Sequence, residues 1–293
     1  DTAYFPGIDL VDTNRFNLVD EPWLFEGVQA MLGNDADAWF SAYKYFIEPA
    51  TDDRPYFSHF FKWESLAEVL ALRSAGGAGL IEWAYLIVVA TLVQAAAVGG
   101  LLILLPLSRM RRTWTGGLRY GSYFFLLGLA FLFVEIAFIQ KFTLFLSHPL
   151  YSIAVVLASF LVFAGAGSAY SARMNRPVTI AVAGIVGIAV IYLLALPPLF
   201  AWLIGIADFL RILLSVILIA PLAFFMGMPF PLGLRRVAED APGFVPWAWG
   251  INGFASVISA VLATLLAIHF GFTVVIVLAL LLYVAAAKEF PGS

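Results

Sequence analysis

Long apolar stretches separated by short polar breaks fill the chain from about Leu80 to its C-terminus. A helix rises about 1.5 Å per residue, so about 20 apolar residues cross the roughly 30 Å of hydrocarbon in a bilayer. We expect seven transmembrane helices, over residues 81–106, 120–140, 150–171, 178–197, 207–228, 247–268 and 271–287. The pattern therefore predicts an all-α polytopic membrane protein.

Prolines and charged residues mark the expected ends of these helices. The first helix is expected to end at Pro106 and the run Arg109, Arg111 and Arg112. Lys141, His148 and Pro149 are expected to separate the second helix from the third, and Pro197 and Pro198 to end the fourth. The apolar segment 199–206 is too short to span a bilayer. We expect it to lie at the interface or to extend the fifth helix.

Residues 1–79 have an ordinary composition and precede the membrane domain, which covers 80–293. Apolar spacing, the helix-stop pair Gly33-Asn34 and a β-rich run predict the following elements: helices over 22–32, 35–43 and 64–73, and a strand over 43–47. This extramembrane segment is therefore expected to be a small α/β piece. Because the chain begins Asp-Thr-Ala, we expect it to be the C-terminal part of a longer protein or a processed product.

Composition supports a membrane protein and excludes several functions. The chain of 293 residues is 62% hydrophobic and only 12% charged, whereas a soluble domain carries about 25% charged residues. Its net charge of −3 gives no basic field for nucleic acid. The absence of cysteine excludes disulfides, thiolate metal sites and cysteine nucleophiles.

The basic residues favour one orientation in the membrane. Alternate loops and the C-terminus hold most of them, namely Arg109, Arg111, Arg112, Arg119, Arg173, Arg176, Arg235, Arg236 and Lys288. The positive-inside rule places these loops and the C-terminus in the cytoplasm. Seven crossings then place residues 1–79 on the opposite face, which is the periplasm for a bacterial inner membrane. A missed span would reverse that side.

Three motifs occur in order along the chain: the run Pro49–Trp63, the residues around Glu135 through Ser152, and Gly227–Arg235. Together they resemble a family of large bacterial membrane proteins in which a spermidine-synthase-like, Rossmann-type domain is fused to multi-span bundles. The resemblance implies that residues 1–79 are the end of such a domain and that its core lies upstream.

The resemblance does not bring a catalytic site into this chain. Spermidine synthases bind a nucleoside cofactor on a Gly-rich loop after the first strand and use an Asp base. The Gly-rich stretch 76–79 leads instead into a membrane helix. No catalytic residue, cofactor or metal ligand is therefore assigned.

Glu135 is the sharpest candidate for a functional residue, because a carboxylate inside a membrane helix is costly and needs a partner or a proton. Gln140 and Lys141 follow near the end of the same helix, where Lys141 is expected to snorkel to the interface. Asp208 and Arg211 are three residues apart and are expected to pair. The alternative for Arg211 is a pair with Glu135 across the bundle.

Two further groups have a structural and a functional interpretation. Thr51, Asp52, Asp53 and Arg54 are expected to form a turn with bonded carboxylates, or a binding site at the membrane face together with His59. The small polar stripe at helical spacing in the sixth span favours close helix packing, with substrate lining as the alternative; it consists of Asn252, Ser256, Ser259 and Ala263. Gly165, Ala169 and Gly184 fit the same packing explanation.

Three functions remain open at this stage. The first is a membrane subunit that anchors a degenerate spermidine-synthase-like domain, with protein partners or as a homo-oligomer. The second is a proton-coupled transporter that uses Glu135. The third is a membrane-bound aminopropyl- or methyl-transferase-like enzyme whose catalytic half lies upstream.

Overall fold

The computed structural model describes residues 23–34, 36–67, 80–108, 116–173 and 178–290. The chain divides into two compact units, each described by itself. The first comprises residues 1–50 and 56–86, and the second comprises 51–55 and 87–293. The five-residue turn 51–55 therefore belongs to the membrane unit, although the residues on both sides of it belong to the first unit.

The first unit contains short helices joined by extended chain. Helices α2 (Trp23–Leu32) and α3 (Ala36–Ala42) confirm the two expected helices, and the Gly33 N–H caps α2 by donating to the carbonyl of Gln29 at 3.0 Å. Residues Trp63–Ser65 form a 3-10 turn at the start of the third expected helix, most of which lies outside the described residues.

The strand expected over 43–47 is wrong. Residues 43–45 form a bend and 46–47 have no regular structure; the N–H of Phe46 bonds to the carbonyl of Phe60 at 2.9 Å without neighbouring strand pairs. The Lys62 ammonium group donates hydrogen bonds to the carbonyls of Phe40, Ser41 and Tyr43 at 2.7–3.0 Å. The described residues contain one isolated bridge, between Thr51 and Arg54, and no strand. The expected Rossmann-like tail therefore stays a prediction.

The membrane part is entirely helical over its described residues. In chain order it comprises α5 (Leu80–Gly99), a π-helical turn (Gly100–Leu104), α6 (Leu105–Ser108), α7 (Gly117–Leu146), α8 (Pro149–Ser171), α9 (Val178–Leu203), α10 (Asp208–Met226), α11 (Pro229–Asp240), a 3-10 turn (Pro242–Phe244), α12 (Val245–Phe270) and α13 (Phe272–Lys288). Six helical stretches here are long and apolar enough to cross a membrane. The fold is that of a multi-pass, all-α membrane protein. The seventh expected crossing corresponds to α13, which is apolar but has 17 residues, so it stays a prediction.

Several expected helix ends are wrong because helices continue through prolines. Pro197 and Pro198 lie inside α9, and segment 199–206 extends this fourth helix to Leu203 instead of the fifth. Pro106 likewise lies inside α6, directly after the π-helical turn, and this helix is described as far as Ser108, the residue before Arg109. A proline lacks the N–H of the i→i−4 bond, and wider local hydrogen-bonding registers accommodate it in membrane helices.

Of the expected break after the second span, His148 and Pro149 are confirmed and Lys141 is wrong. Helix α7 continues past it to Leu146 and stops at Ser147, which adopts a left-handed backbone with φ of 60°. The apolar run Phe142–Leu146 adds one further turn beyond the ammonium group. The helix end is therefore set by Ser147 and by Pro149 at the start of α8.

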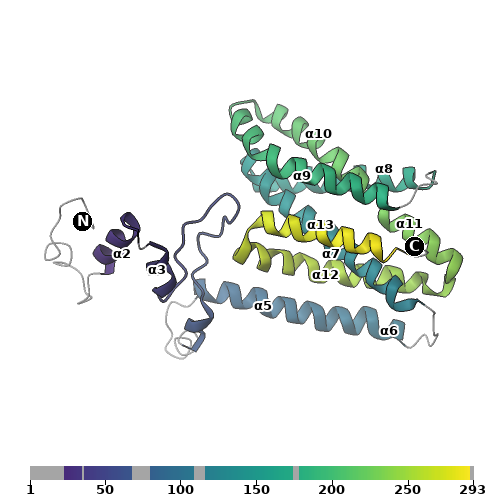
Figure 1. Cartoon of the computed structure of the whole chain (residues 1–293), viewed down its shortest axis with the longest axis horizontal. Coiled ribbons are helices and arrows are strands. Elements are labelled where there is room, and N and C mark those ends of the chain that lie inside the picture. The colour runs from purple at the N-terminus through teal and green to yellow at the C-terminus, as the bar shows by residue number, and fades with distance from the viewer. Residues whose placement is uncertain (1–22, 35, 68–79, 109–115, 174–177, 291–293) are drawn as a thin grey trace. The chain divides into compact units, whose positions relative to one another are not determined.

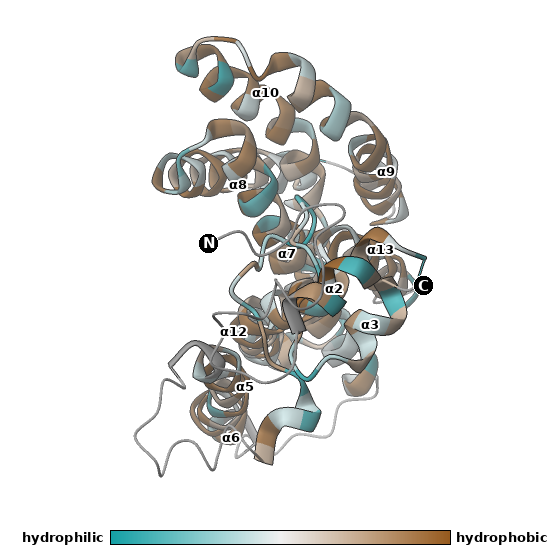
Figure 2. Cartoon of the chain, turned by 90° about the vertical axis from the view of Figure 1, so that its left-hand side faces the viewer, coloured by the Kyte–Doolittle hydropathy of each residue, from teal (hydrophilic) through white to brown (hydrophobic). Residues whose placement is uncertain are grey.

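Helix α7 lies at the centre of the membrane unit and packs against α12, α13 and α8, while α10 packs against α8 and α9 (Figure 1). The membrane helices are coloured mostly as hydrophobic in Figure 2. Leu161 on α8 and Leu194 on α9 are 75% and 77% exposed. Such faces suit contact with lipid rather than water.

Glycines let two of these helix pairs approach closely. A Cβ on Gly128 of α7 would lie 2.6 Å from the carbonyl oxygen of Asn252 on α12. Gly167 of α8 faces the backbone of Phe224, and Gly227 faces the backbone of Ala164, so a Cβ at either would collide with main chain. Gly184 packs on the ring of Phe225, as the packing explanation expects. For Gly165 that explanation is wrong, because open space surrounds it.

Candidate functional site

Glu135 lies midway along α7 and is 9% exposed. It makes no hydrogen bond or ion pair with any residue that the structure describes. A carboxylate removed from water without a partner is strongly disfavoured, so this group must hold a proton or have a polar group nearby.

Tyr283 on α13 supplies the nearby polar group. Its side chain is 1% exposed, and its hydroxyl has no hydrogen-bond partner among the described residues. Helix α13 packs against α7, the helix that carries Glu135. The two helices that pack against each other in the centre of the membrane unit thus each contribute one buried polar side chain to the same region.

Three further polar side chains of the interior are bonded to main chain. Tyr123 donates to the carbonyl of Pro229 at 2.6 Å, and Tyr192 donates to that of Leu218 at 2.6 Å. Ser152 of α8 donates to the carbonyl of Ile139 at 2.9 Å. Glu135 and Tyr283 differ from these groups, because neither has a main-chain acceptor or donor to use.

A second polar site lies at the junction of α12 and α13. The Asp53 carboxylate accepts a hydrogen bond from the Thr273 hydroxyl at 2.7 Å and from the Thr273 N–H at 3.0 Å. The Asp53 carbonyl accepts the N–H of Phe272 at 3.0 Å. Asp53 thereby caps the N-terminus of α13, where unpaired N–H groups and the helix dipole favour a negative charge.

Lys141 completes this second site. Its ammonium group lies 3.2 Å from the Asp53 carboxylate, so the lysine is held in an ion pair and does not snorkel freely. Its neighbour Gln140 is half-buried and makes no hydrogen bond within the described part of the chain. Asp53 thus connects α7 with α13 at one end of the membrane unit.

The expected binding site of Asp52, Asp53, Arg54 and His59 at the membrane face stays a prediction. The turn itself forms as expected, since the Arg54 N–H bonds to the carbonyl of Thr51 at 2.9 Å and to its hydroxyl at 3.1 Å. Asp52 is exposed, whereas Asp53 is committed to α13. His59 belongs to the first unit, where its ring packs on Phe46 and Tyr85. No cluster suited to a metal ion occurs among the described residues.

Arg211 has a structural role at the same end of the bundle. Its guanidinium group donates to the loop carbonyls of Ile204 and Ile206 and to the Phe145 carbonyl at the end of α7. It also lies 3.8 Å from the Asp208 carboxylate, as the spacing predicts. A pair between Arg211 and Glu135 does not form.

The stripe on α12 supports helix packing. The Asn252 amide donates to the carbonyl of Phe124 at 3.0 Å, and the Ser259 hydroxyl donates to that of Leu129 at 2.9 Å. Ala263 is fully buried, and the Ser256 hydroxyl bonds back to its own helix. Side chains that bond across to α7 are held in place by this helix pair, so they are not free to line a substrate path.

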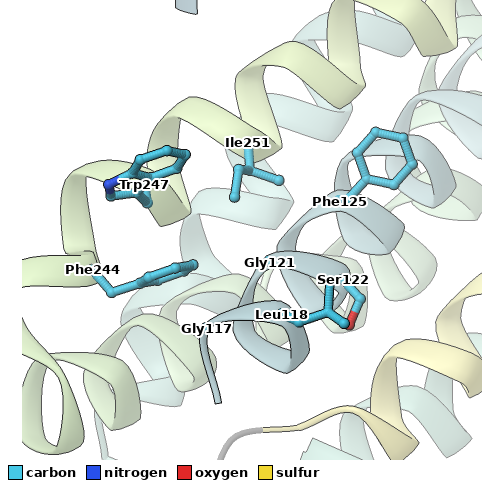
Figure 3. Close-up of a pocket in the computed structure, with 8 residues that line it drawn as sticks. All are labelled: Gly117, Leu118, Gly121, Ser122, Phe125, Phe244, Trp247 and Ile251. Atoms are coloured by element: carbon cyan, nitrogen blue, oxygen red, sulfur yellow. The ribbon is translucent and has the colours of Figure 1, made fainter. Parts of the chain in front are cut away.

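A groove of about 410 Å³ lies beside the starts of α7 and α12. Figure 3 shows the rings of Phe244 and Trp247 on one side and Leu118, Ser122 and Phe125 on the other. The Ser122 hydroxyl already donates to the carbonyl of Arg119 at 2.9 Å. The lining carries no charged side chain, so the groove adds apolar surface rather than a reactive site.

No protein-family model matches the chain, and no curated protein or solved structure is significantly similar to it. The class of the protein therefore rests on its own fold. The family resemblance of the three sequence motifs stays a prediction.

Sequence reasoning missed Tyr283 and Thr273. A tyrosine in an otherwise apolar span is a usable signal, because its hydroxyl needs a partner when buried. Thr273 directly follows the start of a helix after Gly271, which is a recognisable N-terminal pattern. Its partner Asp53 lies 220 residues away, and no local pattern connects the two.

Proposed function

We propose that this chain is an integral membrane module that anchors a spermidine-synthase-like domain at the bilayer surface, within a larger assembly. The observation that carries the proposal is the bonding of Asp53 to Thr273 and Lys141. Through it, a turn from the extramembrane segment becomes part of the membrane unit. The segment is thus held by polar contacts as well as by its covalent link to α5.

The distribution of charge supports an orientation for this module. The end of the bundle formed by the starts of α7 and α11 and the end of α13 holds Arg119, Arg235, Arg236 and Lys288. We place this end in the cytoplasm of a bacterial inner membrane. The end that holds Asp53 then faces the periplasm.

Anchoring is tested by cutting the chain between the two parts. A protease site inserted in the stretch 76–79 allows cleavage in isolated membranes. We expect the N-terminal fragment to stay on the membranes after cleavage, to be released by Asp53→Ala, and to stay with Asp52→Ala. Complete release from the unmodified sequence would contradict anchoring by these contacts.

A covalent version of the same test needs no background mutation, because the chain has no cysteine. The Asp53 carboxylate and the Thr273 hydroxyl are 2.7 Å apart. We expect Asp53→Cys with Thr273→Cys to form a disulfide that joins the cleaved fragments until reductant is added. Asp52→Cys with Thr273→Cys is the matched control and should leave the fragments separate.

Orientation is tested with single cysteines at exposed carboxylates. Asp208, Glu239 and Glu289 are 76%, 59% and 43% exposed in their side chains. An impermeant maleimide added to intact spheroplasts should label Asp208→Cys only. Glu239→Cys and Glu289→Cys should be labelled only in inverted vesicles. If Glu289→Cys is labelled together with Asp208→Cys, α13 does not cross the membrane.

Proton-coupled transport is a second candidate function. It is favoured by Glu135, a buried carboxyl group with no bonded partner in the described structure. Intramembrane carboxyl groups of this kind commonly mark proton or ion pathways. Proteoliposomes with an entrapped pH-sensitive dye test it: an imposed potential should drive proton flux through the unmodified protein and not through Glu135→Gln. Equal flux through both would contradict this candidate.

A further inference from the structure

We propose that Glu135 and Tyr283 together form a proton-binding site in the interior of the helical bundle, in which Glu135 takes and releases the proton and Tyr283 stabilises the ionised carboxylate. The inference deepens the second candidate function and rests on it only for the biological use of the proton. The site itself follows from the arrangement of α7 and α13.

The register of the two helices brings these side chains toward each other. Helices α7 and α13 are antiparallel, because the Tyr123 ring packs on Phe290 at 5.6 Å at one end and Asp53 connects Lys141 to Thr273 at the other. This register places Glu135 and Tyr283 roughly one turn apart along the bundle axis. Helical side chains lean toward the N-terminus of their own helix. In antiparallel helices with this offset, the carboxyl and the phenol lean toward one another.

No other charged group of the described structure competes for Glu135. Besides Glu135, helix α7 carries the titratable or charged side chains of Arg119, Tyr120, Tyr123 and Lys141, and α13 carries Tyr283 and Lys288. The other helices packed around them carry Tyr151 and Tyr170 on α8, Tyr192 on α9, Asp208 and Arg211 on α10, and His269 on α12. Helix α11 carries Arg235, Arg236, Glu239 and Asp240. Lys141 is paired with Asp53, and Arg211 is bonded to loop carbonyls. Tyr192 is committed to the Leu218 carbonyl. A proton is therefore the available counter-charge for the carboxylate.

The chemistry is a simple acid–base exchange. With the proton bound, the carboxylic O–H of Glu135 is a donor and the phenol oxygen is an acceptor. When the proton leaves, the carboxylate becomes an acceptor only, and the Tyr283 hydroxyl turns to donate to it. Both states use the two groups that otherwise have no partner, and no redox step is involved.

Infrared difference spectroscopy of the protein in nanodiscs, taken across a pH titration, tests the site. We expect the C=O band of a protonated carboxyl group to appear and disappear with pH, and to be lost in Glu135→Gln. Tyr283→Phe removes the donor to the carboxylate and should move the midpoint of the band upward by at least about one pH unit, a tenfold change in proton binding. Tyr192→Phe is the matched control and should leave the midpoint unchanged.

Each result decides the question. A titrating band that persists in Glu135→Gln overturns the assignment of Glu135. Equal midpoints for Tyr283→Phe and Tyr192→Phe overturn the role of Tyr283. Glu135→Asp, which keeps a carboxyl group, should retain a titrating band and shows that loss in Glu135→Gln is not loss of folding. A titrating Glu135 band without proton flux in proteoliposomes supports the site and contradicts transport.

Discussion

The carboxylate of Asp53 accepts the hydroxyl of Thr273 at 2.7 Å across 220 residues of sequence. This contact supplies the N-cap of α13 from a part of the chain that precedes α5. The same carboxylate holds Lys141, so one side chain connects the first extramembrane turn, the central helix and the last helix.

Removing this cap should destabilise the membrane unit. Asp53→Ala deletes the acceptor for Thr273 and leaves Lys141 half-buried without its counter-charge. Loss of an N-cap costs about 0.5–2 kcal/mol, and the unpaired ammonium group adds to this loss. Thermal unfolding in detergent should show a lower midpoint for Asp53→Ala. Asp52→Ala, which changes an exposed neighbour, should leave the midpoint unchanged; equal effects would contradict the cap.

Gly271 should tolerate no side chain. Its φ of 84° lies in the region that favours glycine, and a Cβ would collide with the Asp53 carboxylate. Gly271→Ala should therefore cost about 1–3 kcal/mol through backbone strain, beyond the displaced cap. Gly253→Ala is the control, because open space surrounds this glycine within α12 and alanine is the better helix former. Thermal midpoints of the two variants should move in opposite directions.

The α7–α12 contact offers a test of the central packing. Gly128→Ala places a Cβ 2.6 Å from the Asn252 carbonyl oxygen and 2.8 Å from the Cβ of Ala255. The helices must separate to admit it, at a cost of about 1–3 kcal/mol for overpacking. Chemical denaturation should show the loss in Gly128→Ala. Gly187→Ala, a change made in open space on α9, should be neutral or mildly stabilising.

Arg211 should not be replaceable by lysine. Its guanidinium group reaches the carbonyls of Phe145 and Ile206 at the same time, at 3.4 and 3.1 Å. An ammonium group lacks this planar fork of donors and leaves a carbonyl without its partner. We expect Arg211→Lys to lose about 1–3 kcal/mol in stability. Arg236→Lys should change it little, because Arg236 makes only exposed ion pairs with Glu239 and Asp240.

The sequence predicts the helical membrane class and the approximate position of the long apolar helices, because apolar length alone carries that information, but it does not predict helix α11. It does not predict whether a helix ends or continues at a proline. Pro106, Pro197 and Pro198 resemble stops, yet inside a bilayer a helix that continues keeps more of its backbone hydrogen-bonded than one that ends there.

Some of the candidate site residues are recognisable from the sequence, and others are not. Glu135 is recognisable because a charge among Phe and Ile is locally anomalous, and Asp208 with Arg211 is recognisable because the spacing is helical. The roles of Asp53 and Lys141 depend on a contact between distant segments. No local sequence pattern distinguishes Asp53 from Asp52, although only Asp53 bonds to Thr273 and Lys141.

The connection between Asp53 and Thr273 has a consequence for biogenesis. The ribosome makes Asp53 before it makes α5 to α12, so α13 is capped by a residue that was synthesised before these helices. A truncated product that lacks α13 leaves Asp53 and Lys141 with only each other. Helix α13 thus completes the contact around Asp53, and a nascent protein reaches this arrangement only after α13 has been made.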